Sequence, residues 1–297
     1  MATGGTEGRH ERAEGLDALR PVDALAVLSA GQKAAAAVVD GALAEIAAGA
    51  RLAADTLSAG GRLVYAGAGS SGLMAMADAL ELPGTYGIAR DRIVILLAGG
   101  AASLADLAGG YEDDVAQARA DAAGAGIDEK DCVIVVSASG STPYALAIAA
   151  HARDKGARVI ALANNAGAPL FEGAAVSILL PTPPEVVSGS TRMGAGTAQK
   201  IAFNLLSTLV GIHLGHVHDG HMVNLVADNI KLRQRACRIV SDIAGVDAGE
   251  AGRLIERANG SVKAAVLLAA GAPDATAAHA MLEREGQNLR RALENLG

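Results

Sequence analysis

Short apolar runs rich in β-branched residues alternate with helical stretches through the middle of this chain. The alternation predicts βαβ units, in which helices cover both faces of a parallel sheet. The predicted strands are Arg62–Ala66, Ile93–Leu97, Cys132–Val136, Arg158–Ala163 and Val176–Leu180. The helical stretches that separate them are Leu73–Glu81, Leu104–Ala123 and Tyr144–Lys155. The sequence therefore predicts an α/β fold, a three-layer sandwich around a five-stranded parallel sheet.

Helical segments flank this core on both sides. A helical pattern runs from Val22 to Leu57, a long helix is expected from Thr191 to Leu214, and another helix around Leu225–Ile243. From Val246 onward, glycine-containing breaks separate three short predicted helices. The predicted divisions are residues 1–20, a flexible tail; 21–240, the sheet domain with its flanking helices; and 241–297, a small C-terminal helical domain.

Composition narrows the class of protein. The 297 residues carry a net charge of −7, which argues against nonspecific nucleic-acid binding. Aromatic residues make up only 2% of the chain, so the core is expected to consist of Ala, Val, Leu and Ile. Cys132 and Cys237 form no disulfide framework and no metal-binding pattern, which fits a reducing cytoplasm. We expect no signal peptide in residues 1–20, and the apolar stretch Ile93–Ala105 is too short to span a membrane.

Two loops rich in glycine and serine follow predicted strands and precede predicted helices. The first is Gly67–Gly72, and the second is Ser137–Thr142. Backbone N–H groups at such a turn lie at the positive end of the helix dipole and can cradle an anion, to which hydroxyl groups add neutral donors. Since both loops lie at the carboxyl edge of one sheet, they are predicted to hold one phosphate between them.

The first loop also matches the glycine spacing of a dinucleotide-binding fingerprint. That interpretation requires an acidic residue near the end of the second strand to bind a ribose hydroxyl. The second strand ends instead in Leu96-Leu97-Ala98-Gly99-Gly100, without an acid. The serine content of both loops favours a monophosphate.

Two carboxylates are candidates for proton transfer. Glu81 ends the helix after the first loop, and Glu112 follows the second predicted strand and a glycine-rich loop. A solvated helix-end charge would explain either residue alone. Both, however, leave the carboxyl edge of the sheet, where ligands bind in open α/β folds. Such a pair can supply a general acid and a general base.

A histidine-rich break follows the long predicted helix. It contains His213, His216, His218 and His221. A metal site is one interpretation, but only Asp219 stands nearby as a further ligand. Helix capping and subunit contact explain the cluster without a metal, so we expect none.

Several motifs in one order then resemble the N-acetylmuramic acid 6-phosphate etherase family, with which the glucokinase regulatory protein shares a signature. The signature is the segment from Pro184 to Lys200, which reads PEVVSGSTRMGAGTAQK, and the agreement continues through Asn204–Thr208. Upstream and downstream matches are Gly61–Tyr65, Gly67–Gly72, Asp78–Gly87, Leu97–Gly100, Glu112-Asp113, Ser137–Tyr144 and Gly260–Ala265. The resemblance covers roughly residues 40–290.

The resemblance implies a sugar isomerase (SIS) fold that binds phosphosugars, works as a homodimer and needs no cofactor. The implied reaction is that of a carbon–oxygen lyase, which removes D-lactate from N-acetylmuramate 6-phosphate and leaves N-acetylglucosamine 6-phosphate. Glu81 and Glu112 match the family's acid/base positions. The expected phosphate- and substrate-binding residues are Gly69, Ser70, Ser71, Ser137, Ser139, Gly140, Ser141, Thr142, Glu185, Ser190 and Arg192.

This chain departs from the family at three positions that are usually cationic. It has Leu73, Ser141 and Gly194 there, while Arg192 remains. An unpaired lactyl carboxylate is costly to desolvate. Two alternative hypotheses therefore stand beside the etherase: an isomerase or lyase that acts on another 6-phosphosugar, and a phosphosugar-sensing regulator without catalysis.

Overall fold

The computed structural model describes residues 5–227 and 229–296 and divides into two units. The first unit comprises Met1–Leu80 and Asp91–Ser207, and the second comprises Glu81–Arg90 and Thr208–Gly297. The second unit thus begins well before residue 241, where the sequence pattern places the C-terminal domain, and it also takes in a short segment after Leu80.

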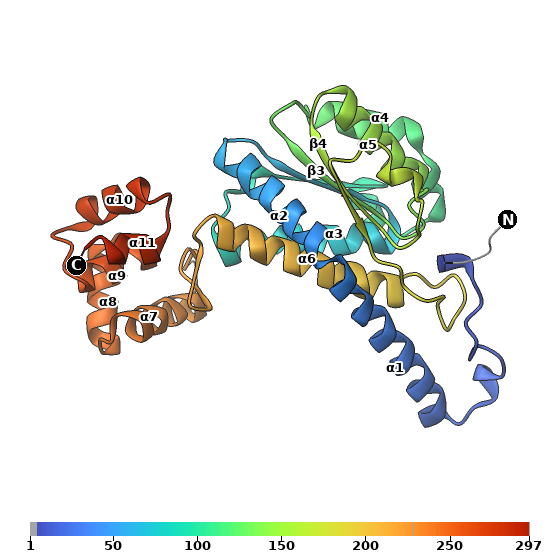
Figure 1. Ribbon diagram of the computed structural model, residues 1–297, viewed down its shortest axis with the longest axis horizontal. Helices are drawn as coiled ribbons and strands as arrows, with labels where there is room; N and C mark the ends of the chain where they lie inside the picture. Colours follow the sequence, from blue (N-terminus) through green and yellow to red (C-terminus); the bar gives the residue numbers. More distant parts are fainter. Residues whose placement is uncertain (1–4, 228, 297) are drawn as a thin grey trace. The chain divides into compact units, whose positions relative to one another are not determined.

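A five-stranded parallel sheet forms the centre of the first unit (Figure 1). Its strands are β1 (Leu63–Gly67), β2 (Ile93–Leu97), β3 (Cys132–Ser137), β4 (Arg158–Ala163) and β5 (Val176–Leu179). They lie in the order β2-β1-β3-β4-β5, and every neighbouring pair is parallel. The five predicted strands are confirmed to within one residue at each end. Because the chain moves outward in opposite directions from β1 and β3, the loops that leave these two strands diverge and open a crevice between them.

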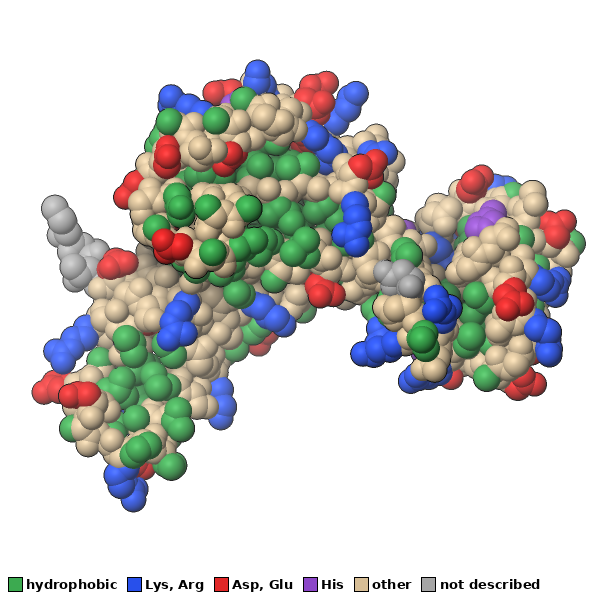
Figure 2. All heavy atoms as spheres, turned by 180° about the vertical axis from the view of Figure 1, so that it is seen from behind, with side chains coloured by type: hydrophobic (Ala, Val, Ile, Leu, Met, Phe, Trp, Pro, Cys, Tyr) green, Lys and Arg blue, Asp and Glu red, His purple; other side chains and the backbone are tan. Residues whose placement is uncertain are grey.

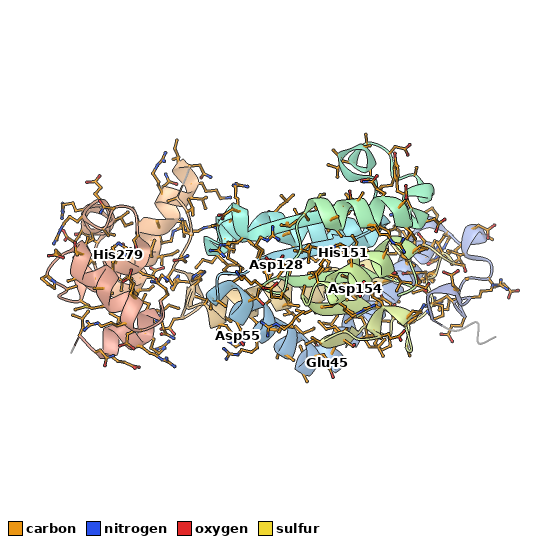
Figure 3. The ribbon with its side chains drawn as sticks, turned by 90° about the horizontal axis from the view of Figure 1, so that it is seen from above. Glu45, Asp55, Asp128, His151, Asp154 and His279 are labelled. Carbon is orange, nitrogen blue, oxygen red and sulfur yellow. The ribbon has the colours of Figure 1, made fainter. Side chains whose placement is uncertain are left out.

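Helices cover both faces of the sheet. On one face, α4 (Val115–Gly124) and α5 (Pro143–Asp154) pack over buried aliphatic side chains of β1, β3 and β4 (Figure 1). The other face carries α2 (Leu43–Ser58) and the first-unit parts of α3 (Gly69–Tyr86) and α6 (Gly194–His213). Charged residues such as Glu45 and Asp55 of α2 and Asp154 of α5 are exposed on the outer surfaces of these layers (Figure 3). The predicted three-layer sandwich is confirmed.

One predicted helix is shorter than expected. The stretch Leu104–Ala123 forms a regular helix only from Val115, and short 3₁₀ turns at Gly100–Leu104 and Gly109–Asp113 precede it. Two adjacent glycines at 109 and 110 disfavour an α-helix there. Asp114 precedes the first helical residue, Val115, and its side chain caps the helix by accepting a hydrogen bond of 2.8 Å from the Gln117 N–H.

The N-terminal helical segment has an exposed apolar surface. It consists of α1 (Pro21–Ala37), a 3₁₀ turn (Val38–Ala42) and α2. By length and composition alone, Pro21–Ser58 could cross a membrane, but the α2 part packs on the sheet as a core helix does. On α1, Val22 is 75% exposed and Leu25 is 63% exposed, and hydrophobic side chains gather there in Figure 2.

The second unit is helical. It contains a two-stranded hairpin (Val217–His218 and His221–Met222) and the helices α7 (Ile230–Ala244), α8 (Ala248–Arg257), α9 (Val262–Ala269), α10 (Ala275–Arg284) and α11 (Leu289–Glu294). Within the described residues after Val246 there are four helices and not the predicted three, because three glycine-containing breaks separate four segments. The buried Lys263 ammonium donates to the carbonyls of Gly215 (3.4 Å) and Gln287 (3.2 Å), and burial lowers its pKa to about 8.

A buried carboxylate links α3 to the sheet and to α6. Asp78 is 5% exposed. Its Oδ1 accepts hydrogen bonds of 2.9 Å from both Asn204 Nδ2 and Ser207 Oγ, and its Oδ2 accepts one of 3.3 Å from the Tyr65 hydroxyl. Burial raises the pKa of Asp78 from 3.8 to about 6, because desolvation of the charge outweighs these hydrogen bonds.

We expect Asp78→Asn to raise the free energy of unfolding at pH 7 by about 2–3 kcal/mol. Folding raises the pKa of this acid, so the penalty is absent below pH 3.8, grows as the pH rises, and is complete above about pH 6. Asparagine keeps an acceptor for Asn204 and Ser207 and gains a donor for Tyr65. Urea unfolding at pH 4, 5 and 7 measures the effect, with the exposed Asp55→Asn as control. A variant less stable than the wild type at pH 7 would show that the ionised carboxylate is favourable here.

Candidate functional site

A pocket opens where the sheet order reverses, at the carboxyl ends of β1 and β3. Both glycine/serine loops contribute to it, as the sequence predicts for an anion site. Twelve residues line it, and all belong to the first unit: Thr6, Glu7, Ala68, Ser70, Ser71, Glu112, Ser137, Ala138, Ser139, Thr142, Gly189 and Thr191. Neither Lys, Arg nor His is among these lining residues.

The three glycines of the first loop have two different structural roles. Gly67 and Gly72 bring the end of β1 and the first turn of α3 into close contact, since a Cβ on Gly67 would lie 2.9 Å from the Gly72 Cα. Gly69 has a φ of +53°, and a Cβ there would collide with Oε1 of Glu112. The loop therefore leaves room for a carboxylate directly above it. Ser70 and Ser71 lie in the first turn of α3, where backbone N–H groups have no partner within the helix.

The second loop holds a cluster of hydroxyl groups at the start of α5. Ser137 Oγ lies 2.8 Å from Thr142 Oγ1 and 3.3 Å from Ser139 Oγ, and it accepts a hydrogen bond of 3.0 Å from the Gly140 N–H. Ser139 Oγ in turn accepts from the Ser141 N–H at 3.1 Å and from the Ser141 hydroxyl at 3.0 Å. These bonds fix the hydroxyl groups beside the N-terminus of a second helix. Neutral donors at two helix N-termini suit an anionic group.

Glu112 brings a carboxylate into the same pocket. It lies in the 3₁₀ turn Gly109–Asp113, which is anchored by the ring of Tyr111 against Gly99. Gly99 has a φ of +77°, and a Cβ there would lie 2.5 Å from the ring. Glu112 is partly buried, and its pKa is raised, first by burial and second by repulsion from Asp113. A carboxyl group with a raised pKa beside an anion cradle is suited to proton transfer.

Comparison with known proteins assigns the chain to a family. The model of the SIS domain matches residues 28–164. An N-acetylmuramic acid 6-phosphate etherase of Deinococcus radiodurans is 40% identical over 288 residues, which are 97% of this chain and 94% of that protein. The etherase of Burkholderia lata is 40% identical over 291 residues, which are 98% of this chain and 96% of that protein. The chain belongs to the N-acetylmuramic acid 6-phosphate etherase family. A solved phosphoheptose isomerase of Francisella tularensis, 20% identical, covers 66% of this chain and 98% of its own with a TM-score of 0.47.

The pocket gathers part of the residue set expected from the resemblance to the etherase family. Ser70, Ser71, Ser137, Ser139, Thr142 and Glu112 line it. Gly69 and Gly140 belong to the same loops and set their backbone paths, both with positive φ. Ser141, Ser190 and Arg192 are adjacent in sequence to lining residues but are not among them, and Arg192 is exposed. Leu73 and Gly194, two of the three departures from the family, are also outside the lining.

Glu185 of the family signature has a clear structural role. It is buried, and its carboxylate accepts hydrogen bonds of 2.9 Å from the N–H groups of Gly194 and Ala195. These are the first residues of α6, so Glu185 satisfies the free donors at the start of that helix. A Cβ on Gly194 would lie 3.0 Å from Glu185 Oε2, which explains why a small residue is well accommodated next to this cap.

Glu81 is not among the residues that line the pocket. It is exposed on α3 and belongs to the second unit. It is ten positions after Ser71 on one continuous helix, which corresponds to roughly 15 Å along the helix axis.

Four lining residues are not among those expected from the sequence. Thr6 and Glu7 come from the predicted flexible tail, whereas Gly189 and Thr191 flank Ser190 within the signature that the sequence points to. No local pattern marks the first pair, but their position follows from a contact with Asn165, a residue far away in sequence.

The histidine cluster lies in the second unit. His218 Nε2 lies 3.6 Å from Asp219 Oδ2, and burial, with Lys263 as a second cause, lowers the pKa of His216 to about 4. In the described part of the chain, no group of three or more His, Cys, Asp or Glu side chains is arranged to hold a metal ion.

Proposed function

We propose that this protein is an N-acetylmuramic acid 6-phosphate etherase, a lyase that releases D-lactate and leaves N-acetylglucosamine 6-phosphate. Family membership supports this proposal, and so does one feature of the pocket. Glu112, a carboxyl group with a raised pKa, lies beside two hydroxyl-rich loops at helix N-termini. This arrangement provides an anion site and a proton-transfer group in the same pocket. The cytoplasm is the compartment we propose, in keeping with two free cysteines.

The phosphate is proposed to bind between the two loops. Ser71 and the N-terminus of α3 provide donors from one side, and Ser137, Ser139 and Thr142 provide donors from the other. Because none of the described lining residues is cationic, neutral N–H and O–H donors provide the hydrogen bonds to the phosphate. We propose that Arg192, which follows the lining residue Thr191, binds the carboxylate of the lactyl group.

The proposed reaction uses carboxyl groups alone. Opening of the sugar ring makes C1 an aldehyde, which acidifies the proton on C2. One glutamate removes that proton, the electron pair forms the C2–C3 double bond, and the C3–O bond breaks. The other glutamate protonates the departing lactate oxygen. Water then adds at C3, its hydroxyl bonding to C3 and a proton returning to C2. We assign these roles to Glu81 and Glu112.

We further propose that the protein is a homodimer in which the partner subunit's Glu81 completes each pocket. Within one chain, α3 carries Glu81 roughly 15 Å beyond Ser71 along the helix axis, which is longer than a six-carbon sugar bound at that serine. The exposed apolar side chains of α1, including Val22 and Leu25, suit a contact between two copies. A closed two-fold dimer is the commonest arrangement for such a contact.

Incubation of N-acetylmuramate 6-phosphate with the protein in heavy-oxygen water tests the proposed function. We expect D-lactate without label and N-acetylglucosamine 6-phosphate with label in its C3 hydroxyl, both read by mass spectrometry. Turnover of other 6-phosphosugars without lactate release would favour an isomerase or a different lyase. Binding of phosphosugars without any turnover would favour a sensor.

Removal of one loop hydroxyl should weaken phosphosugar binding. We expect Ser139→Ala to reduce the affinity for N-acetylglucosamine 6-phosphate by about 1.5–3 kcal/mol, the usual value of a hydrogen bond to a charged group. Ser58→Ala is the comparison, because Ser58 is exposed at the end of α2 and lies outside the lining. Calorimetric titration measures both. Unchanged affinity in Ser139→Ala would remove this hydroxyl from the phosphate site.

A further inference from the structure

The N-terminal segment Gly5–Gly8 forms one wall of the pocket. Thr6 is 1% exposed, and its N–H donates a hydrogen bond of 2.9 Å to Asn165 Oδ1. Asn165 Nδ2 donates one of 3.0 Å to Thr6 Oγ1. The amide of Asn165 therefore pairs with both the N–H and the hydroxyl group of Thr6. The next residue, Glu7, lines the pocket together with Ser71 and Glu112.

Glycines on both sides of Thr6 and Glu7 make this contact sterically feasible. Gly5 has a φ of +82°, and a Cβ on it would collide with Asn165 Oδ1. Gly8 is buried, and a Cβ on Gly8 would lie 2.8 Å from Cγ of Pro184. The carbonyl of Gly8 accepts a hydrogen bond of 3.5 Å from Ser188 Oγ. The segment is thus held at three points, and Glu7 lies between them.

Asn165 also connects this wall to the second loop. Its Nδ2 lies 3.4 Å from the carbonyl oxygen of Ser139, to which it donates. Ser139 is itself a lining residue. A single amide therefore positions the hydroxyl loop and the N-terminal wall relative to each other.

The charge of the lining residues limits what Glu7 can bind. Glu7 and Glu112 both carry carboxyl groups, and none of the described residues that line the pocket is Lys, Arg or His. An ionised carboxylate accepts hydrogen bonds but repels a phosphate. The hydroxyl groups of a sugar are donors that a carboxylate can bind strongly, because the hydrogen bond is assisted by its charge.

We propose that Glu7 is a sugar-binding residue that accepts a hydrogen bond from a hydroxyl group of the phosphosugar, at the part of the ligand away from the phosphate. Glu7 thereby makes the pocket select a polyhydroxylated phosphate ester over a bare anion. The inference rests on the proposed phosphosugar site, and it adds a specificity-determining residue to the loops and Glu112.

Calorimetric titration of two ligands tests the role of Glu7. The first is N-acetylglucosamine 6-phosphate, and the second is inorganic phosphate, which probes the loops alone. We expect Glu7→Ala to lower the affinity for the sugar phosphate roughly 10-fold or more. The affinity for inorganic phosphate should stay the same or rise. Glu11→Ala removes an exposed carboxylate four residues further along the chain and outside the pocket, and it should change neither affinity.

Three outcomes would overturn the proposal. If Glu7→Ala raises the affinity for both ligands equally, or changes neither affinity, Glu7 does not contact the sugar. If it lowers both affinities equally, the role of Glu7 is to maintain the wall and not to bind the ligand. Thr6→Val keeps the volume of the side chain and removes the hydroxyl that Asn165 binds. It should therefore lower the affinity for the sugar phosphate, and not that for inorganic phosphate, by a smaller factor than Glu7→Ala does.

Turnover separates this inference from the proposed function. Glu7-dependent binding of N-acetylglucosamine 6-phosphate, without lactate release from N-acetylmuramate 6-phosphate, would reject the etherase activity and keep the role of Glu7. Lactate release with sugar binding that does not depend on Glu7 would reject the role of Glu7 alone.

Discussion

We expect Glu112→Gln to lower the turnover of N-acetylmuramate 6-phosphate by about 10²–10⁴-fold, the usual contribution of a general acid or base. Glutamine preserves the shape of the side chain above Gly69, where Oε1 of Glu112 lies, but it cannot exchange a proton. The phosphate loops remain intact, so the affinity for the product sugar phosphate should change little. Single-turnover kinetics and calorimetry on the same preparation measure the two effects separately.

Asp113→Asn provides the matched control for Glu112. Asp113 is exposed on the same 3₁₀ turn and is not a lining residue. Its charge is the second cause of the raised pKa of Glu112, after burial. The control should therefore remain active, while the limb of its pH–rate profile that belongs to Glu112 moves to lower pH. Wild-type turnover by Glu112→Gln would contradict the catalytic role and favour a phosphosugar sensor.

Local sequence patterns are sufficient to predict the sheet and the two loops. Each strand is a short apolar run, and each loop follows its strand directly, so that the parallel arrangement alone brings Gly67–Gly72 and Ser137–Thr142 to one edge. Glu112 is predictable for the same reason, because it lies in the connection between β2 and α4, which starts at this edge of the sheet. The glycine spacing of the first loop also has a physical cause, since two glycines allow close packing and Gly69 accommodates the carboxylate.

Other parts of the site depend on contacts between residues that are distant in sequence. The Thr6–Asn165 contact joins residues 159 positions apart, and nothing in the composition of residues 1–20 predicts it. The resemblance to the family places Glu185 among the substrate-binding residues, and the structure adds that its carboxylate caps α6. The stretch before α4 has a helical composition, but its glycine pair and the Asp114 cap move the start of the helix to Val115.

The second large effect concerns Glu81, which we propose acts in the pocket of the partner subunit. We expect Glu81→Gln alone to lower turnover by about 10²–10⁴-fold, as Glu112→Gln does. If Glu81 acts in the partner's pocket, a dimer of one Glu81→Gln chain and one Glu112→Gln chain contains one pocket with both glutamates. Random exchange makes half of the dimers mixed, so activity should recover to about one quarter of the wild-type value per chain.

The exchange needs a control in which no complete pocket can form. Mixing Glu81→Gln with the double variant Glu81→Gln/Glu112→Gln meets this condition and should recover nothing. Light scattering should give the mass of a dimer for every species. If both glutamates act within one chain, the mixed dimer has no complete pocket and stays inactive. We expect the two-chain pocket because of α3. This continuous helix places Glu81 roughly 15 Å along its axis from Ser71, the serine proposed to hold the phosphate.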